Sequence, residues 1–213
     1  MHILTLLGSP RRKGNTAEVL GCFEQYIAGS DAVRPAGGRG AIQGAPKEAR
    51  QGVPPHTYER LNLIDYTVRP CLGCLVCQKV FDEPGCRQKD DALAIFARLR
   101  AADLIVYATP LYCWDFSSHL KLLMDRHFCM IKWDAPGGRK SLLAGKRAAL
   151  LVTCGDAEEN NADLIPVVFR RQMEAARCEP AGVYILADCP STPGRLGSRP
   201  TLLAGQMAAE LLV

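Results

Sequence analysis

The chain has 213 residues, of which 48% are hydrophobic and 23% charged, and its formal net charge is +4. These values are typical of one globular domain and exclude a disordered, collagen-like or coiled-coil chain. The small positive excess does not indicate binding to nucleic acid or to a membrane surface. The longest uncharged stretch, 104–114, has 11 residues, fewer than the roughly 20 that span a bilayer. The N-terminus lacks the apolar region of a secretory signal, so we expect a cytoplasmic protein.

Five short apolar runs alternate with segments of helical periodicity. We predict strands at 2–7, 58–64, 104–108, 148–153 and 183–187, and helices from 14 onward and at 90–100, 117–131, 164–177 and 202–212. Strands that are apolar on both faces and alternate with helices indicate a parallel sheet covered on both sides. Such sheets bind ligands beyond the carboxyl ends of their strands, so the loops after strands one, three and four are candidate binding loops.

The segment 31–57 interrupts this alternation. It holds five Gly and four Pro in 27 residues and few large apolar side chains. That composition cannot build a core, so we predict a loop or disordered insertion that is dispensable for the fold. One Gly-Gly-Arg-Gly stretch at 37–40 is weak support for RNA contact, and we expect no nucleic-acid partner.

The loop between the first strand and the first helix has the composition of a phosphate site. It runs from Gly8 to Thr16 and carries hydroxyl, amide and cationic side chains at the start of a helix, where backbone N–H groups are unpaired. It contains neither the dinucleotide nor the Walker glycine pattern, so a monophosphate fits better. The alternative is an ordinary polar turn in which Asn15 or Thr16 caps the helix. On the first interpretation the hydroxyl, amide and cationic side chains of this loop bind the phosphate together with the backbone N–H groups.

Four of the ten cysteines lie between positions 71 and 86. Cys71, Cys74 and Cys77 follow one another at two-residue spacings, and Cys86 comes after Pro84-Gly85. Thiolates favour iron-sulfur clusters or zinc, and overlapping two-residue spacings are typical of chains that wrap a 4Fe-4S cluster. Free or redox-active thiols and a zinc site are the alternatives. The other six cysteines are expected to be small buried hydrophobic residues.

Three motifs together resemble the NADPH-dependent FMN reductases and iron-sulfur flavoproteins of the flavodoxin-like superfamily. They are Gly8-Ser9-Pro10-Arg11 with Gly14-Asn15-Thr16, Pro70-Cys71-Leu72-Gly73-Cys74 leading to Cys86 and Asp90-Asp91, and Ala108-Thr109-Pro110-Leu111-Tyr112 continuing to Leu120-Lys121 and Asp125-Arg126. The resemblance covers residues 1 to about 130. It implies a doubly wound α/β domain with a five-stranded parallel sheet of order 2-1-3-4-5, binding FMN at the ends of strands one and three.

The resemblance also implies which part of the flavin each loop contacts. The FMN phosphate would sit on the first loop, and the loop 110–117 would line the ring and the ribityl chain. The phosphate ligands implied on the first loop are Ser9, Arg11, Lys13, Asn15 and Thr16. The residues implied on the loop 110–117 are Pro110, Leu111, Tyr112, Trp114, Phe116 and Ser117, and the flavin's other edge would meet Thr153 and Gly155. In such proteins the flavin carries the redox chemistry and the chain positions it, so we name no catalytic side chain. The isolated His119 and His127 are expected at the surface or partly packed.

The function expected from these features is an FMN-dependent oxidoreductase that passes electrons from NAD(P)H to a quinone, a flavin or a protein. One alternative is an iron-sulfur flavoprotein that carries electrons between partner proteins without its own nicotinamide site. Another is a regulatory α/β domain without flavin. We expect a homodimer or homotetramer with no membrane partner.

Overall fold

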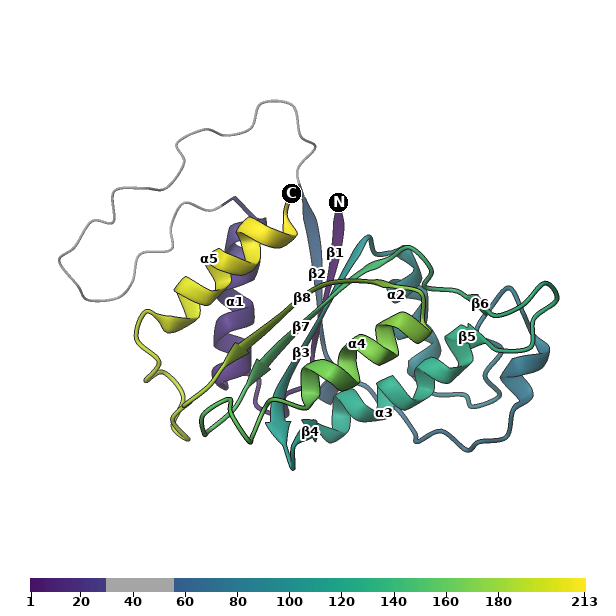
Figure 1. Ribbon diagram of the computed structural model, residues 1–213, viewed down its shortest axis with the longest axis horizontal. Coiled ribbons are helices and arrows are strands. Elements are labelled where there is room, and N and C mark those ends of the chain that lie inside the picture. The colour runs from purple at the N-terminus through teal and green to yellow at the C-terminus, as the bar shows by residue number, and fades with distance from the viewer. Residues whose placement is uncertain (30–55) are drawn as a thin grey trace.

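The structure, a computed structural model, describes residues 1–29 and 56–213. Most of the predicted insertion 31–57 lies outside the described residues. Its predicted C-terminal boundary is wrong by one residue, because strand β2 (Thr57–Asn62) begins at Thr57, which pairs with His2 of β1 (His2–Leu7). Figure 1 shows the domain, with a central sheet between two layers of helices.

The central sheet confirms the predicted topology. Its five parallel strands run in the order β2-β1-β3-β7-β8, which is 2-1-3-4-5 when only these strands are counted. The three further strands are β3 (Leu104–Tyr112), β7 (Arg147–Thr153) and β8 (Glu179–Leu186). The middle strands β1, β3 and β7 are buried along almost their whole length, because helices cover both faces.

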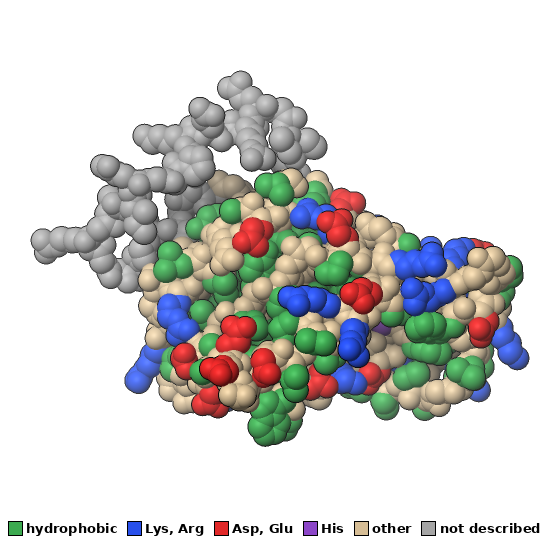
Figure 2. Space-filling view, viewed as in Figure 1, with side chains coloured by type: hydrophobic (Ala, Val, Ile, Leu, Met, Phe, Trp, Pro, Cys, Tyr) green, Lys and Arg blue, Asp and Glu red, His purple; other side chains and the backbone are tan. Residues whose placement is uncertain are grey.

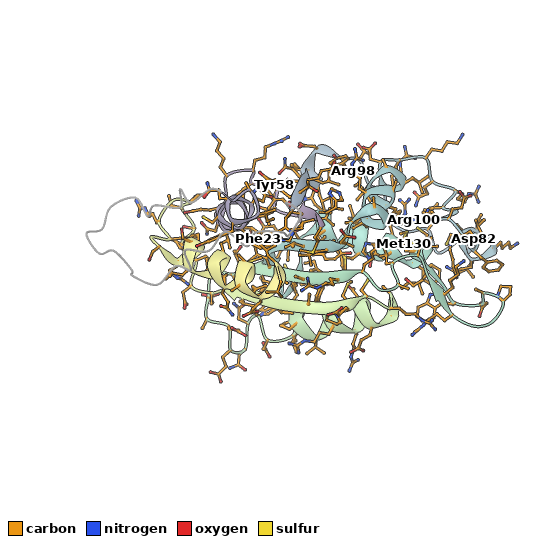
Figure 3. The ribbon with its side chains drawn as sticks, turned by 90° about the horizontal axis from the view of Figure 1, so that it is seen from above. Phe23, Tyr58, Asp82, Arg98, Arg100 and Met130 are labelled. Atoms are coloured by element: carbon orange, nitrogen blue, oxygen red, sulfur yellow. The ribbon has the colours of Figure 1, made fainter. Side chains whose placement is uncertain are left out.

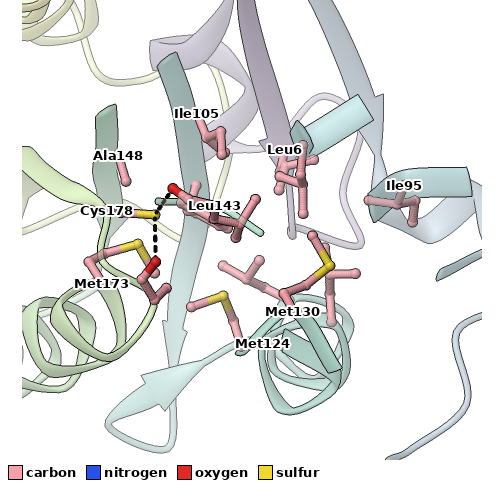
Figure 4. Packing of buried hydrophobic residues seen from close by; sticks show 14 of the residues in the cluster. Leu6, Ile95, Ile105, Met124, Met130, Leu143, Ala148, Met173 and Cys178 are labelled. Atoms are coloured by element: carbon pink, nitrogen blue, oxygen red, sulfur yellow. Dashed lines mark hydrogen bonds between the residues drawn. The ribbon is translucent and has the colours of Figure 1, made fainter. Parts of the chain in front are cut away.

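Helices cover both faces of the sheet (Figure 1). On the first face, α1 (Asn15–Ile27) and α5 (Arg199–Leu211) pack with β1, β3, β7 and β8 around Phe23 and Met207. On the second, α2 (Ala92–Ala101), α3 (Ser118–Arg126) and α4 (Ile165–Ala175) enclose the larger core. Figure 4 shows that core, where the Cys178 thiol donates to the carbonyls of Leu143 and Ala176. Cys178 is therefore one of the structural cysteines.

The predicted helix 117–131 is shorter than expected. Helix α3 ends at Arg126 and tightens into a 3₁₀ turn (His127–Met130), and the chain then forms a small antiparallel hairpin of β5 (Ile131–Lys132) and β6 (Lys140–Ser141). The side-chain amide of Gln78 donates to the carbonyls of Phe128 and Ile131. In a continuing helix these carbonyls would instead accept backbone N–H groups of later residues. The prediction for His127 is also wrong, since its ring is buried between Phe96 and Tyr107.

Three short elements complete the described chain: 3₁₀ turns at Leu63–Asp65 and Val76–Lys79, and the strand β4 (Asp115–Phe116), which pairs antiparallel with the end of β3. Within the described residues, no helix has both the length and the apolar character needed to cross a membrane.

Candidate functional site

The loop after β1 is fixed to the neighbouring strand and helix by its first residue. The Gly8 N–H donates to the Ala108 carbonyl at 2.7 Å, and the Ser117 hydroxyl donates to the Gly8 carbonyl at 2.6 Å. A Cβ atom at Gly8 would lie 2.8 Å from the Cβ of Leu120. Only glycine therefore fits here, and the loop meets the start of α3 at the carboxyl edge of the sheet.

The N-terminus of α1 fits an anion. The first backbone hydrogen bond of this helix runs from the Glu18 N–H to the Gly14 carbonyl. The N–H groups of Asn15, Thr16 and Ala17 come before it and have no acceptor within the helix. The N-cap is Gly14, and no side chain caps the helix, so the expected alternative of a cap at Asn15 or Thr16 is wrong. An uncapped helix start carries partial positive charge and free donors, as a phosphate group requires.

The predicted phosphate ligands lie around this helix start in different ways. Ser9 is buried, and its hydroxyl accepts the Arg11 N–H at 3.1 Å, which shapes the turn. The Arg11 guanidinium donates to the Ser191 carbonyl at 3.2 Å, and the Asn15 amide donates to the Pro190 carbonyl at 2.8 Å. The Asn15 Oδ1 atom is buried without a hydrogen-bond partner. Lys13 is exposed.

The loop after β3 is a tight hairpin with strained backbone. Leu111 pairs with Phe116 and Tyr112 with Asp115, so Cys113 and Trp114 alone form the turn. Both have positive φ angles, 48° and 61°, the geometry of a type I′ turn that usually takes Asn-Gly. For other residues the left-handed region costs about 1–2 kcal/mol each. The turn presents the side chains of Tyr112 and Trp114, which are 43% and 64% exposed.

The remaining residues predicted on this loop have structural surroundings. Phe116 is buried in the core of the second face, and Leu111 packs against that core. Ser117 is fully buried and caps α3 by accepting the Leu120 N–H. Pro110 is half-buried at the end of β3. The exposed part of the loop is therefore its tip, 112–114.

The loop after β7 meets the first loop through a pair of hydroxyls. Thr153 and Thr16 are both buried, and their Oγ1 atoms lie 2.6 Å apart. Gly155 is exposed beyond them. Burial raises the pKa of the intervening Cys154 thiol to about 11, with the nearby Cys189 thiol adding to the effect. Cys154 is therefore a neutral thiol at pH 7 and not a nucleophile.

The four cysteines predicted as metal ligands line one pocket. Cys71 and Cys74 are exposed, Cys86 is half-buried and Cys77 is buried, and the buried Cys129 adds a fifth thiol to the same pocket. The donor chemistry suits a soft metal or an iron-sulfur cluster. In the part of the chain that the structure describes, however, no three Cys, His, Asp or Glu side chains converge closely enough to hold a metal ion.

The segment that carries these cysteines is anchored to the far end of α3. Arg126 and Asp90 form an ion pair with both side chains 1% exposed, at 2.7 Å from Nη1 to Oδ2. Arg126 also donates to the Arg69 carbonyl and, at 3.3 Å, to the Cys86 Sγ. The buried Lys132 donates to the carbonyls of Cys77 and Pro84. In Figure 3, Asp82 of this segment lies at the right-hand end of the molecule, and Phe23 of α1 lies left of its centre.

Comparison with known proteins agrees with this architecture. The family model described as NADPH-dependent FMN reductase matches residues 1–176. The chain belongs to this family. FMN is the family's cofactor, and the uncapped start of α1 fits its phosphate.

Individual relatives and solved structures extend the comparison. An iron-sulfur flavoprotein of Methanocaldococcus jannaschii is 29% identical over 126 residues, 59% of this chain and 51% of that protein. The match thus spans about half the length of this curated relative. An NAD(P)H:quinone oxidoreductase from Methanothermobacter marburgensis superposes with a TM-score of 0.60 at 19% identity, covering 100% of this chain and 99% of that one. An FMN-dependent NADH-azoreductase from Bacillus anthracis gives 0.60 at 14%, covering 98% and 96%. At these identities the likeness shows the flavodoxin-like fold.

Sequence reasoning missed three parts of this family member's site. The loop between β8 and α5 supplies the carbonyls that Asn15 and Arg11 bind, and nothing in its sequence signals that role. Cys129 belongs to the cysteine pocket although it lies far from the motif. Arg126 and Asp90 belong to two separate motifs of the sequence, and nothing in either motif indicates that they form an ion pair.

Proposed function

We propose that this protein is an FMN-dependent NAD(P)H oxidoreductase that passes electrons from a nicotinamide to a quinone, a flavin or a protein acceptor. The observation that carries the proposal is the uncapped N-terminus of α1, which has three backbone N–H groups without an acceptor in the helix. Arg11 lies in the loop before it, Asn15 is its first residue, and the hydroxyl of the next residue pairs with that of Thr153. An anionic group of the size of one phosphate suits that arrangement. The family membership supports FMN as the molecule that brings it.

Each loop at the carboxyl edge of the sheet has a task in this proposal. The first loop would bind the FMN phosphate through backbone N–H groups of α1 and the side chains of Arg11 and Asn15. The tip of the β3–β4 hairpin, with Tyr112 and Trp114, would flank the ring, and the backbone around Gly155 would meet its other edge. When bound, FMN accepts a hydride and releases electrons, so the chain's contribution is orientation and the local electric field.

The cysteine pocket supports a second, separate proposal. Cys71, Cys74, Cys77 and Cys86 line one pocket beside the Arg126 guanidinium, and four thiolates are the ligand set of a 4Fe-4S cluster. An electron carrier without a nicotinamide site is less favoured, because the family model is that of NADPH-dependent reductases. We also keep the prediction of a homodimer or homotetramer, which light scattering tests.

The decisive experiment is NADPH oxidation by the FMN-loaded protein, with ferricyanide as acceptor. Turnover that depends on added FMN supports the proposal. An absorbance spectrum of the purified protein complements it, because flavin bands show whether FMN is retained. A protein that binds no FMN, or binds it without oxidising NADPH or NADH, would contradict the proposal.

A further inference from the structure

The β3–β4 hairpin holds an aromatic residue in a backbone conformation that ordinarily belongs to glycine. Trp114 has φ +61°, and Cys113 before it has φ +48°. Positive φ at two successive residues without glycine is uncommon and points to a constraint other than local preference. Core packing does not supply it, because Trp114 is 64% exposed and Cys113 is exposed.

The position of this turn gives the exposed ring a function. The hairpin's base holds the first loop through the hydrogen bond from Ser117 to the Gly8 carbonyl, so its tip stands at the rim of the proposed FMN site. Figure 2 shows hydrophobic side chains projecting from the lower edge of the molecule, where Figure 1 places β4. Tyr112, 43% exposed, adjoins the turn. Two exposed aromatic rings at a ligand edge form a surface for another flat ring.

We propose that Trp114 is an acceptor-binding residue that selects planar aromatic electron acceptors by stacking. This deepens the proposed function and rests on it. The overall reaction with a quinone is NADPH + H⁺ + quinone → NADP⁺ + hydroquinone, in which the quinone gains two electrons and two protons. Trp114 neither gains nor loses electrons in this reaction. It holds the acceptor's ring against the rim of the site, and an acceptor without a flat ring gains nothing from it.

Turnover experiments with two acceptors test the stacking role. Menadione is a planar aromatic quinone, and ferricyanide accepts electrons without an aromatic ring. Trp114→Gly removes the ring and suits the positive φ, so its denaturation midpoint should not fall. Its ratio of kcat/KM for menadione to that for ferricyanide should drop roughly three- to tenfold, the range of aromatic stacking. Trp114→Phe should keep most of the ratio. Rates are expressed per bound FMN.

The second tryptophan, Trp133, supplies a matched control and a binding readout. It lies on the turn of the β5–β6 hairpin, where its ring stacks with Phe128, and not on the β3–β4 hairpin that carries Trp114. In the Trp133→Phe protein, Trp114 is the only indole of the chain, and menadione should quench its fluorescence saturably. Trp133→Phe alone should leave the acceptor ratio unaltered.

The outcomes separate the inference from the proposed function. Equal acceptor ratios in Trp114→Gly and Trp114→Phe would overturn the inference, as would a rise in KM for NADPH alone, which would assign the ring to the nicotinamide. If neither acceptor supports NADPH oxidation, the proposed function fails. In that case, saturable quenching of Trp114 fluorescence by menadione would still support Trp114 as a binding site for flat rings. No quenching would contradict the inference as well.

Discussion

The hydroxyl of Thr16, in the first turn of α1, lies 2.6 Å from the hydroxyl of Thr153, at the end of β7. Both side chains are buried, at 2% and 4% exposed. The contact joins two loops that are 137 positions apart in the sequence, and it fixes the start of α1 against the middle of the sheet. The shape of the predicted phosphate site therefore depends on a pair of side chains that a ligand does not need to touch.

Thr16→Val should lower the free energy of unfolding by about 1–3 kcal/mol, because it leaves the Thr153 hydroxyl buried and unpaired. Adding Thr153→Val should recover much of this loss, since no unpaired polar group then remains. Urea unfolding of the two single variants and the double variant measures the coupling. Losses that simply add would show that the hydroxyls do not act as a pair.

Arg11→Ala should weaken FMN binding about ten- to a hundredfold, because a charge-assisted hydrogen bond contributes roughly 1.5–3 kcal/mol. Quenching of flavin fluorescence on titration with protein gives the affinity. Arg12→Ala is the matched control, since Arg12 is exposed and already paired with Asp65. Equal FMN affinities in the two variants would show that Arg11 does not bind the phosphate.

His127→Phe should make stability less dependent on pH. Burial lowers the pKa of His127 from 6.5 to about 4, so between these values the unfolded chain binds a proton that the folded chain does not. Stability is then lost as the pH falls from 6.5 toward 4, by about 2 kcal/mol between pH 7 and 5. Urea unfolding at both pH values measures this. If His127→Phe loses the same stability between pH 7 and 5 as the unchanged protein, a group other than His127 causes the loss.

Arg126→Met should destabilise the protein by about 3–5 kcal/mol, because it leaves the Asp90 carboxylate buried without its partner. Adding Asp90→Asn should recover part of the loss. Lys121→Ala is the control, since its exposed pair with Asp125 within α3 should contribute at most about 0.5 kcal/mol. Similar losses in Arg126→Met and Lys121→Ala would contradict the buried pair.

The same pair has a pH signature of its own. Burial disfavours the Asp90 carboxylate, but hydrogen bonds from Arg126 and from the Arg69 N–H outweigh that effect and lower the pKa of Asp90 below its ordinary 3.8. The stability it contributes is present above that value and is lost as the pH falls below it. This window lies below the one expected for His127, so the two effects separate.

Protein prepared without oxygen should contain iron and acid-labile sulfide near four per chain if the cysteine pocket binds a 4Fe-4S cluster. Cys74→Ser should abolish both. Cys113→Ser is the control, because Cys113 is exposed on the β3–β4 hairpin and lies outside the pocket. Protein that contains FMN and no iron would leave the reductase without a cluster.

The sheet could be predicted because the strand runs are apolar on both faces, which only a covered parallel sheet explains. Its order came from the resemblance and is confirmed by the pairing of β1 with both β2 and β3. The first loop could be predicted because Gly8 and Gly14 bracket polar residues before a helix. The small hairpin of β5 and β6 could not, since strands of two residues have no periodicity.

Contacts that use backbone atoms escaped sequence analysis for a different reason. The carbonyls of Pro190 and Ser191 bind Asn15 and Arg11, and every residue carries such a group. His127 continued the apolar spacing of α3, yet its polar ring gave no sign that two aromatic rings enclose it. Burial of a polar side chain depends on which distant segments pack around it, and a single sequence does not encode that locally.

Helix α3 supports two different regions at its opposite ends. Its cap, Ser117, holds the first loop, and its last residue, Arg126, holds the cysteine segment. At 1.5 Å per residue these anchors are roughly 14 Å apart along the axis. A rigid helix thus sets the distance between the first loop and the cysteine segment, so neither region can shift along the axis without disturbing the cap or the buried ion pair of α3.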